Sequence, residues 1–269
     1  MGSRRLGGQP DPGRDARALL AHALGLAPDR LTLERERSLT AGELAAYETL
    51  LERRQAHEPV SRITGRRMFW GRNFKITPQV LDPRPETEVI VAAALNRPPP
   101  RTLLDLGTGS GILALTLLAE WPGARAVATD ISPGALAVAR ANAAALGLAE
   151  RLTLIEADWL AGVTGTFDLI VSNPPYIAGA EIAGLAPEVR DHDPRGALTP
   201  GGDGLDAYRT LVPAALAHLA PGGWLMVEIG PTQGPAVAGL FEAAGYAQVT
   251  RLPDLDGRAR VVSGRRAAG

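Results

Sequence analysis

The chain has 269 residues, of which 45% are hydrophobic and 21% are charged, so it is long enough to bury a core and too apolar for a disordered chain. Its formal net charge of −1 excludes the chain-wide basic surface that many nucleic-acid and membrane-surface proteins carry, although a local patch is compatible with it. It contains no cysteine, which excludes disulfides, thiolate catalysis and cysteine-based zinc sites.

The first residues, MGSRRLGGQPDPGRD, carry arginines but no apolar segment after them, so they do not resemble a secretory signal. No uninterrupted apolar run of about 18 residues occurs in the sequence, so no membrane span is expected. We therefore expect a cytoplasmic protein. Residues 1–13 are rich in glycine and proline and are predicted to form a disordered tail.

A helical pattern begins after this tail. Apolar residues recur at three- and four-residue spacing in ARALLAHALGL and in LTAGELAAYETLLERRQAHEP. Thr40, with Glu43 nearly one helical turn further on, is typical of a capping box at the start of the second helix. We predict a small N-terminal helical domain at residues 14–67. The alternating stretch FWGRNFKITPQVL predicts a hairpin linker at residues 68–82.

From residue 83 to residue 269 the pattern is one of alternating strands and helices. The strand-like runs are RTLLDL, ARAVATD, LTLIEAD, FDLIVSN, GGWLMVEIG, YAQVTR and RARVVSG. Helical stretches lie between them at roughly 111–120, 133–146, 205–219 and 233–244. Such alternation predicts βαβ units, and therefore an α/β domain with a seven-stranded, mostly parallel sheet and helices on both faces.

The first strand of this domain leads into the glycine-rich turn of LLDLGTGSGILAL. Gly107, Gly109 and Gly111 lie where the strand changes into a helix, and glycine lets the backbone adopt positive φ and approach a ligand closely. The following helix presents free N–H groups to an anionic group. The next strand ends in Asp130, which is placed to accept hydrogen bonds from both hydroxyls of a ribose. The alternative is a glycine turn that only packs.

The third strand leads into EADWL. Asp158 could accept a hydrogen bond from an adenine amino group, and Trp159 could cover the adenine face, although it could also be a core aromatic. The glycine loop has the pattern G-x-G-x-G rather than the G-x-G-x-x-G of dinucleotide folds. A glycine loop, an acid and an acid–aromatic pair at three successive strand ends favour adenosine bound across the strand tips.

The fourth strand ends in VSNPPYI, at the edge of the sheet where ligands of open α/β folds bind. Asn173 offers a carbonyl acceptor and an amide donor. Pro174 and Pro175 are rigid and have no backbone N–H, and Tyr176 supplies a flat ring. Such a site suits a planar NH2 group. Hydrogen bonds from its two hydrogens to Asn173 Oδ1 and to the Pro174 carbonyl would return electron density to the nitrogen and direct its lone pair at an electrophilic methyl. A rigid turn without function is the alternative.

Together, DLGTGSG, Asp130, the DW pair and NPPY resemble the class I S-adenosylmethionine-dependent methyltransferases that act on amide or base nitrogens. Further stretches narrow the resemblance to the release-factor glutamine methyltransferases, the PrmC or HemK family, over residues 14–266. These stretches are EPVSRITGRRMFWGRNFKITPQVLDPRPETE, EVRDHDPRGAL, GGDGLDAYR, GGWLMVEIG and LDGRARVV. The resemblance implies a Rossmann-like fold, S-adenosyl-L-methionine as cofactor, and methylation of the glutamine in the Gly-Gly-Gln motif of class I peptide-chain release factors.

The resemblance also implies roles for individual residues. Asn173 and Pro174 are the expected catalytic pair, and with Pro175 and Tyr176 they are expected to hold the substrate glutamine. With Asp158 included from the third strand, the residues expected to bind S-adenosylmethionine are Gly107, Thr108, Gly109, Ser110, Gly111, Asp130, Asp158, Trp159 and Asn173. Class I release factors are the expected partners, and we expect no membrane, no direct nucleic-acid contact and no metal.

The chain departs from the family pattern in two places. Asp82 stands where the family commonly has isoleucine in LIPRPETE, and the helical domain begins late, as if its first helix were missing or replaced by the tail. The tail also contains Gly-Gly-Gln at residues 7–9, the tripeptide that the family modifies. Coincidence is the simpler interpretation, and self-methylation or pseudosubstrate binding of Gln9 is the sharper hypothesis.

Other interpretations remain open at this point. An amino-methyltransferase that acts on a ribosomal-protein glutamine or on a nucleic-acid base can use the same motif logic, and RPETE at residues 84–88 is the stretch that favours a release factor. An inactive cofactor-sensing or release-factor-binding module is the alternative outside the enzymes. Asp191, His192 and Asp193 could suggest a metal site, but adjacent residues rarely converge on one ion.

Overall fold

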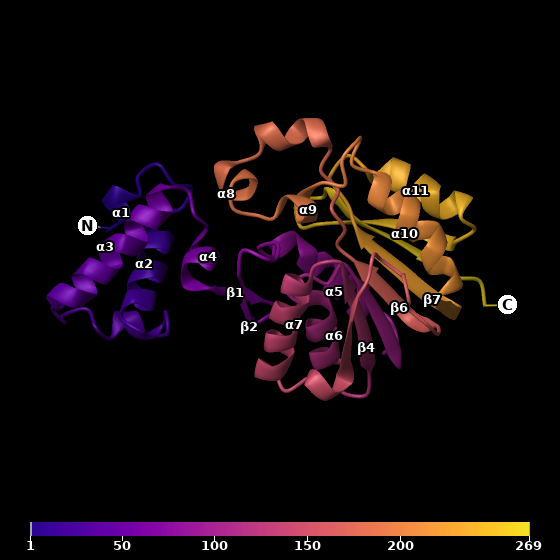
Figure 1. Cartoon of the computed structure of the whole chain (residues 1–269), viewed down its shortest axis with the longest axis horizontal. Coiled ribbons are helices and arrows are strands. Elements are labelled where there is room, and N and C mark those ends of the chain that lie inside the picture. The colour runs from indigo at the N-terminus through magenta and orange to yellow at the C-terminus, as the bar shows by residue number, and fades with distance from the viewer. Residues whose placement is uncertain (1, 269) are drawn as a thin grey trace. The chain divides into compact units, whose positions relative to one another are not determined.

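The computed structural model describes residues 2–268 and divides the chain into two compact units, and Figure 1 labels their α-helices and several of their strands. One unit comprises Met1–Arg66 together with Ala186–His192, and we name it the helical unit. The other comprises Arg67–Leu185 and Asp193–Gly269, and we name it the sheet unit. The segment Ala186–His192 therefore leaves the sheet unit and packs with residues that lie much earlier in the chain.

The helical unit is built from short helices. Its described elements are α1 (Gly2–Arg5), α2 (Pro12–Ala23), the 3-10 turn η1 (Arg30–Thr32), α3 (Ala41–Gln55), α4 (Val60–Thr64) and α8 (Pro187–Arg190). The predicted capping box of α3 is confirmed, because Thr40 Oγ1 accepts from the Glu43 N–H and Glu43 Oε2 accepts from the Thr40 N–H. The buried cluster of this unit contains Leu6, Ala16, Leu19, Tyr47, Leu51 and Ile63.

The start of the chain differs from its prediction. Residues 1–13 were expected to be disordered, but Gly2–Arg5 is helical and the next residue, Leu6, is only 1% exposed in the cluster of the helical unit. Gln9 is also buried, and its Nε2 donates a hydrogen bond to the Arg54 carbonyl at 3.0 Å. The helical unit therefore includes this segment and begins with the short helix α1. One buried leucine and one buried amide outweigh the glycine and proline content on which the prediction rested.

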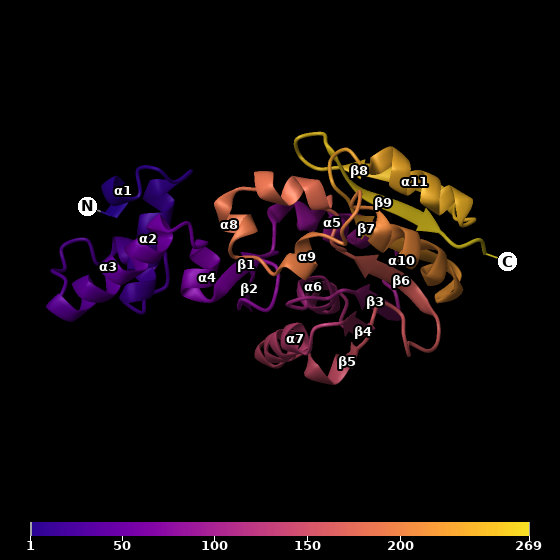
Figure 2. The ribbon, with the colours of Figure 1, turned by 45° about the horizontal axis from the view of Figure 1, so that its top comes forward.

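The sheet unit contains a seven-stranded sheet in the order β5-β4-β3-β6-β7-β9-β8 (Figure 2). Its strands are β3 (Thr102–Leu106), β4 (Arg125–Asp130), β5 (Leu152–Glu156), β6 (Phe167–Ser172), β7 (Leu219–Glu228), β8 (Ala247–Pro253) and β9 (Ala259–Arg265). The strands from β5 to β7 in this order pair in parallel, whereas β9 is antiparallel to both β7 and β8. The predicted mostly parallel α/β sheet is confirmed.

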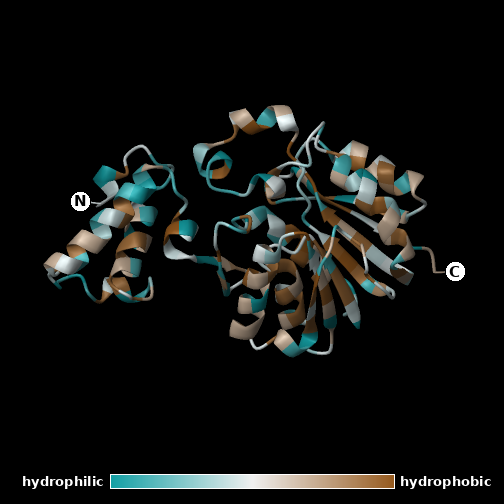
Figure 3. Ribbon diagram, viewed as in Figure 1, coloured by the Kyte–Doolittle hydropathy of each residue, from teal (hydrophilic) through white to brown (hydrophobic). Residues whose placement is uncertain are grey.

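Helices cover both faces of the sheet, and the strands between them are apolar over much of their length (Figure 3). The cluster on one face includes Leu115 and Val138, and the cluster on the other includes Leu211 and Phe241. The described helices and 3-10 turns of this unit are η2 (Pro85–Thr87), α5 (Glu88–Leu95), α6 (Ile112–Glu120), α7 (Pro133–Ala145), η3 (Ala149–Arg151), η4 (Gly179–Gly184), α9 (Arg195–Leu198), α10 (Asp206–Ala217) and α11 (Gly234–Ala243). Over residues 2–268, no helix is both long and apolar enough to cross a membrane.

A separate two-stranded hairpin, β1 (Arg66–Phe69) and β2 (Arg72–Lys75), precedes the large sheet. It ends earlier than the predicted linker at residues 68–82, where Pro78 lacks the N–H that a paired strand requires. The side chain of Asn142 on α7 holds its last residue, because Lys75 N–H donates to Asn142 Oδ1 at 2.7 Å. The segment after the hairpin is thus anchored beside the carboxyl ends of the sheet strands.

Candidate active site

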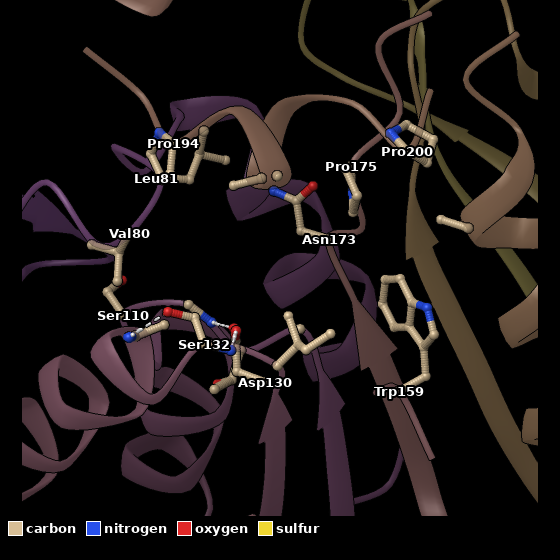
Figure 4. Close-up of a pocket in the computed structure, with 18 of the residues that line it drawn as sticks. Val80, Leu81, Ser110, Asp130, Ser132, Trp159, Asn173, Pro175, Pro194 and Pro200 are labelled. Carbon is tan, nitrogen blue, oxygen red and sulfur yellow. Dashed lines mark hydrogen bonds between the residues drawn. The ribbon is translucent and has the colours of Figure 1, made fainter. Parts of the chain in front are cut away.

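A cavity of about 500 Å³ opens in the sheet unit where β3, β4 and β6 end (Figure 4). This is the edge at which the strand order turns from β3 toward β4 on one side and β6 on the other, the usual ligand position in open α/β sheets. Asn173 and Pro175 lie on one side of the cavity, across from Asp130 and Ser132. The predicted cofactor residues that line it are Gly107, Thr108, Gly109, Ser110, Asp130, Asp158, Trp159 and Asn173.

Asp130 is held rigidly at the end of β4. Its Oδ2 accepts a hydrogen bond from the Gly109 N–H at 2.8 Å, and its Oδ1 accepts one from the Ser132 N–H at 2.9 Å. Gly109 has a φ of 56°, a backbone conformation that favours glycine, and an added Cβ there would meet nothing within 4 Å. The loop between β3 and α6 is therefore tied to the carboxylate through its backbone while its open side faces the cavity.

Gly111 has a different role from the other loop glycines. It does not line the cavity, although it was predicted to bind the cofactor. Its φ is 83°, and a Cβ built on it would lie 2.9 Å from Leu115 Cδ1 and 3.3 Å from the Ala139 Cβ. The geometry thus places Gly111 at the packing contact between the start of α6 and α7, so the glycine pattern combines ligand approach with helix packing.

Asp105 of β3 is hydrogen-bonded to the glycine loop and to the helix α6 that follows it. It is 1% exposed, and its Oδ2 accepts hydrogen bonds from Thr108 Oγ1 at 2.6 Å and from the Ala114 N–H at 3.2 Å. Burial raises the pKa of this carboxyl to about 6, the two hydrogen bonds oppose that rise, and the nearby charge of Asp130 adds to it. Asp105 Oδ1 is buried with no hydrogen-bond partner among the described residues.

Trp159 is part of both the wall and the core. It lines the cavity, and it also packs against the buried cluster that contains Phe167 and Val163. An added Cβ on Gly107 would lie 3.4 Å from the Trp159 ring, so the glycine lets the indole approach the loop. Both interpretations of this residue are therefore compatible with its position.

Ile131, which the sequence pattern did not identify, lines the same cavity and is 69% exposed.

The NPPY segment, residues 173–176, does not face the cavity as a whole. Asn173 and Pro175 line it, whereas Pro174 is buried and neither Pro174 nor Tyr176 belongs to its wall. The Tyr176 ring packs beside the buried cluster under α10 and α11, and its hydroxyl donates to Glu228 Oε1 at 3.3 Å. The predicted flat ring beside the substrate is thus directed partly into the core.

The side-chain NH2 group of Asn173 is held by a buried threonine. Its Nδ2 donates a hydrogen bond to Thr87 Oγ1 at 3.2 Å, and Thr87, the last residue of η2, is completely buried. Within residues 2–268, no group donates a hydrogen bond to Asn173 Oδ1 or to the Pro174 carbonyl. The side chain thus keeps one acceptor available at the rim of the cavity.

Glu228, at the end of β7, is the acid behind this segment. It is 1% exposed, and burial raises the pKa of its carboxyl to about 7, while hydrogen bonding with Thr87 and the charge of Arg260 oppose the rise. Burial of the Tyr176 hydroxyl, together with the charge of Glu228, raises the pKa of that hydroxyl above its usual range. The stretch GGWLMVEIG is one of those that resemble the family, but the sequence by itself gives Glu228 no role.

The three residues after α8 do not form one metal site; they are Asp191, His192 and Asp193. Asp191 and His192 belong to the helical unit, whereas Asp193 belongs to the sheet unit. Asp193 is buried: its Oδ2 accepts from Arg84 Nη2 at 2.6 Å and its Oδ1 accepts from the Asp82 N–H at 3.1 Å. No group of three or more His, Cys, Asp or Glu residues in the described part of the chain could hold a metal ion.

Several cavity residues were given no individual role by the sequence, although some of them lie in stretches that resemble the family. They come from the segment after the hairpin, from the turn after β4, and from the loop and helix that follow α8. These residues are Gln79, Val80, Leu81, Ser132, Ala135, Pro194, Gly196, Ala197, Thr199, Pro200, Asp206, Ala207 and Thr210. Only an apolar or small side chain beside a ligand is needed at most of these positions, so their residue types carry little information about the site.

The cavity therefore combines two kinds of surface. A glycine loop and a fixed carboxylate suit an adenosine with its ribose, and the rim at Asn173 offers a free amide oxygen beside a rigid proline segment. An amide oxygen is a good acceptor for an NH2 group but is no general base and no nucleophile. The arrangement suits transfer of a group onto a nitrogen that needs orientation rather than deprotonation.

Comparison with known proteins gives matches over nearly the whole chain. The family described as PrmC N-terminal domain matches residues 1–65, and the family described as Methyltransferase small domain matches residues 85–203. The release factor glutamine methyltransferase of Cereibacter sphaeroides is 58% identical over 96% of this chain and 92% of its own length. The enzyme of the same name from Rhodospirillum rubrum is 48% identical over 98% of this chain and 82% of its own length.

Solved structures show the same fold at much lower identity. A methyltransferase from Pyrococcus furiosus superposes with a TM-score of 0.57 at 20% identity, covering 74% of this chain and 91% of its own. At that identity the likeness concerns the fold alone. It confirms the predicted Rossmann-like α/β fold.

Proposed function

Because the chain belongs to the release factor glutamine methyltransferase family, we propose that it transfers a methyl group from S-adenosyl-L-methionine to a glutamine side chain of a release factor. The acceptor is the amide nitrogen of the Gly-Gly-Gln motif in class I peptide-chain release factors. The observation that carries the proposal for this chain is the orientation of Asn173. Its Nδ2 is bonded to Thr87, which leaves its Oδ1 available at the rim of the cavity.

The residues of the cavity fit S-adenosyl-L-methionine. Its volume of about 500 Å³ suits a small-molecule cofactor, and Asp130 is fixed where a ribose would need an acceptor. Asp105 Oδ1, buried without a partner next to the glycine loop, adds a further acceptor near the same site. When bound, the cofactor supplies a methyl group on a positively charged sulfur. Gly107, Gly109, Asp130 and Trp159 are the residues that we propose hold it.

The substrate amide is a poor nucleophile because its nitrogen lone pair is delocalised. We propose that Asn173 Oδ1 and the Pro174 carbonyl accept hydrogen bonds from its two N–H groups, which localises the lone pair and directs it at the methyl. The nitrogen then bonds to the methyl carbon as the carbon–sulfur bond breaks, and a proton leaves the nitrogen afterwards. Orientation of this kind lowers a barrier by about 7–11 kcal/mol in favourable cases.

The chain's own Gly-Gly-Gln is a poor acceptor by the same criterion. Gln9 is buried, and its Nε2 already donates a hydrogen bond to the Arg54 carbonyl. Its amide nitrogen therefore cannot meet another acceptor without first breaking this hydrogen bond. We propose that the partner's glutamine, and not Gln9, is methylated, and that the reaction takes place in the cytoplasm, where release factors act.

The test is mass spectrometry of an unmethylated class I release factor incubated with the protein and S-adenosylmethionine. We expect one added methyl group on the glutamine of the Gly-Gly-Gln peptide. Asn173→Ala should reduce the rate by roughly 10²–10³-fold, as loss of one oriented transition-state contact does, with cofactor affinity retained. Methylation of a ribosomal-protein glutamine or of a nucleic-acid base, with none on the release factor, would contradict the proposed substrate.

A further inference from the structure

Two buried polar contacts lie behind the NPPY segment. Asn173 Nδ2 donates to Thr87 Oγ1 at 3.2 Å, and the Tyr176 hydroxyl donates to Glu228 Oε1 at 3.3 Å. Thr87 and Glu228 are 0% and 1% exposed. Neither residue lines the cavity. They therefore hold the NPPY segment from outside the cavity.

The sheet register explains why these groups meet. Ser172 at the end of β6 pairs with Val227 of β7 in parallel register, so Asn173, just beyond β6, and Glu228, the last residue of β7, lie side by side. Thr87 ends the turn η2 that immediately precedes α5, which packs on the same sheet. A carboxyl at position 228 is thus placed beside NPPY by the fold rather than by a mobile loop.

The contact between Asn173 and Thr87 sets which atom of the amide faces the cavity. An asparagine side chain presents either its NH2 or its oxygen to a neighbour. The NH2 of Asn173 donates to Thr87 Oγ1, so the carbonyl oxygen Oδ1 is turned the other way.

We propose that Thr87 and Glu228 are positioning residues for methyl transfer. Thr87 orients the amide of Asn173 so that Oδ1 is the atom that meets the substrate NH2, and Glu228 holds the NPPY segment through the Tyr176 hydroxyl. The proposal rests on the proposed function, because it concerns the acceptor side of that reaction. The Tyr176 carbonyl is held from the other side by Gln233 Nε2 at 2.8 Å.

The stability of the fold does not account for Glu228. Its Oε2 is buried with no hydrogen-bond partner in the described part of the chain, and a buried carboxyl with an unsatisfied oxygen destabilises a folded protein. The nearby Arg260 is already paired with Asp254 at 3.1 Å, and Glu86 adds a like charge. A function at the acceptor site explains why a costly group stands at this position.

The experiment compares Thr87→Val, which removes the hydroxyl at constant shape, with Thr87→Ser, which keeps it. Thr116→Val is the matched control, because Thr116 is also 0% exposed and its hydroxyl has no partner in residues 2–268. We expect Thr87→Val to lower kcat on the release factor by roughly 10²-fold, as small misplacements at reacting groups do, with the Kd for S-adenosylmethionine unchanged. Thr87→Ser and Thr116→Val should keep most of the wild-type kcat.

Glu228→Gln extends the test to the second residue. It should also lower kcat, because the Tyr176 hydroxyl then loses its carboxyl partner. If Thr87→Val does not fold, the comparison of Glu228→Gln with Thr116→Val carries the same measurement. Equal kcat values for all of these variants would overturn the proposal, as would a loss in Thr116→Val as large as that in Thr87→Val.

A second readout does not depend on turnover. The side-chain N–H resonances of Asn173, assigned by their loss in Asn173→Ala, should shift in Thr87→Val and stay near their wild-type positions in Thr87→Ser and Thr116→Val. Unchanged resonances in Thr87→Val would overturn the positioning role. A wild-type protein that does not methylate the release factor would overturn the proposed function instead, and the resonances would still decide the orientation of Asn173.

Discussion

Asp130 and Asn173 stand on opposite sides of one cavity, and the groups that hold them come from different distances along the chain. Asp130 accepts from the backbone of Gly109 and Ser132, which are 21 and 2 residues away. Asn173 and Tyr176 bond to the side chains of Thr87 and Glu228, which are 86 and 52 residues away. We name these the cofactor edge, around residues 105–111 and 130, and the acceptor edge, around residues 173–176.

The difference teaches how the two tasks are built. The cofactor edge uses backbone N–H groups and glycine conformations, which a short sequence motif can specify. The acceptor edge must present one atom of an amide rather than the other, and that requires side chains that the sheet register brings together. Substitutions at the cofactor edge should therefore change cofactor affinity, whereas substitutions at the acceptor edge should change turnover.

The largest expected effect besides that of Asn173→Ala concerns the pH dependence of stability at the acceptor edge. Burial raises the pKa of Glu228 from 4.5 to about 7, so its stability contribution is complete below pH 4.5 and is lost as the pH rises to about 7. A shift of this size corresponds to about 3 kcal/mol. Glu228→Gln should remove that part of the pH slope in urea unfolding measured between pH 4.5 and 8.

Asp105 supplies the control for that measurement at the cofactor edge. Its pKa is raised from 3.8 to about 6. Asp105→Asn should therefore reduce the pH dependence of the unfolding free energy between pH 3.8 and about 6, and leave that dependence largely unchanged between pH 6 and 7. If Glu228→Gln left the wild-type slope intact up to pH 7, the carboxyl would not be the buried titrating group that the structure indicates.

The next effect separates the two edges directly. Asp130→Ala removes the acceptor of two backbone hydrogen bonds and of the expected ribose contacts, so the Kd for S-adenosylmethionine should rise by roughly 30-fold, about 2 kcal/mol. At saturating cofactor its kcat should stay near the wild-type value. Calorimetric titration and steady-state kinetics measure the two quantities. A fall in kcat with an unchanged Kd would contradict the division into two edges.

A smaller effect sharpens the comparison within the glycine loop. Gly111→Ala places a Cβ in a left-handed conformation and 2.9 Å from Leu115, so it should destabilise the protein by about 2 kcal/mol with little effect on cofactor affinity. Gly109→Ala meets no atom within 4 Å but points a methyl group at the cavity side of the loop, so it should weaken cofactor binding more than Gly111→Ala does. Equal losses of affinity would refute the packing role of Gly111.

The smallest expected effect is the absence of a product. Because Gln9 Nε2 is a buried donor, incubation of the protein alone with S-adenosylmethionine should add no methyl group to the N-terminal peptide. Peptide mass spectrometry measures this. A methylated Gln9 would mean that the start of the helical unit opens often enough to present its amide to an acceptor edge.

Much of the sheet unit could be predicted from sequence. The run FDLIVS is a buried strand because apolar residues continue until Asn173 and two prolines end it, and the glycines after LLDL mark a strand-to-helix turn. The start of the chain was predicted wrongly because glycine and proline content outweighed Leu6 in the pattern. A single apolar residue in a short window carries no sign that a distant helix will bury it.

The sequence by itself determined the seven-stranded α/β sheet, the glycine loop and the presence of Asp130 and Asn173 at strand ends, because these depend on periodicity and on conformations that individual residues prefer. Only the tertiary structure decided that Gly111 packs, that Tyr176 turns toward Glu228, and that Thr87 holds Asn173. Those contacts join residues far apart in the chain. Their partners are set by strand register and burial, which no short stretch of sequence specifies.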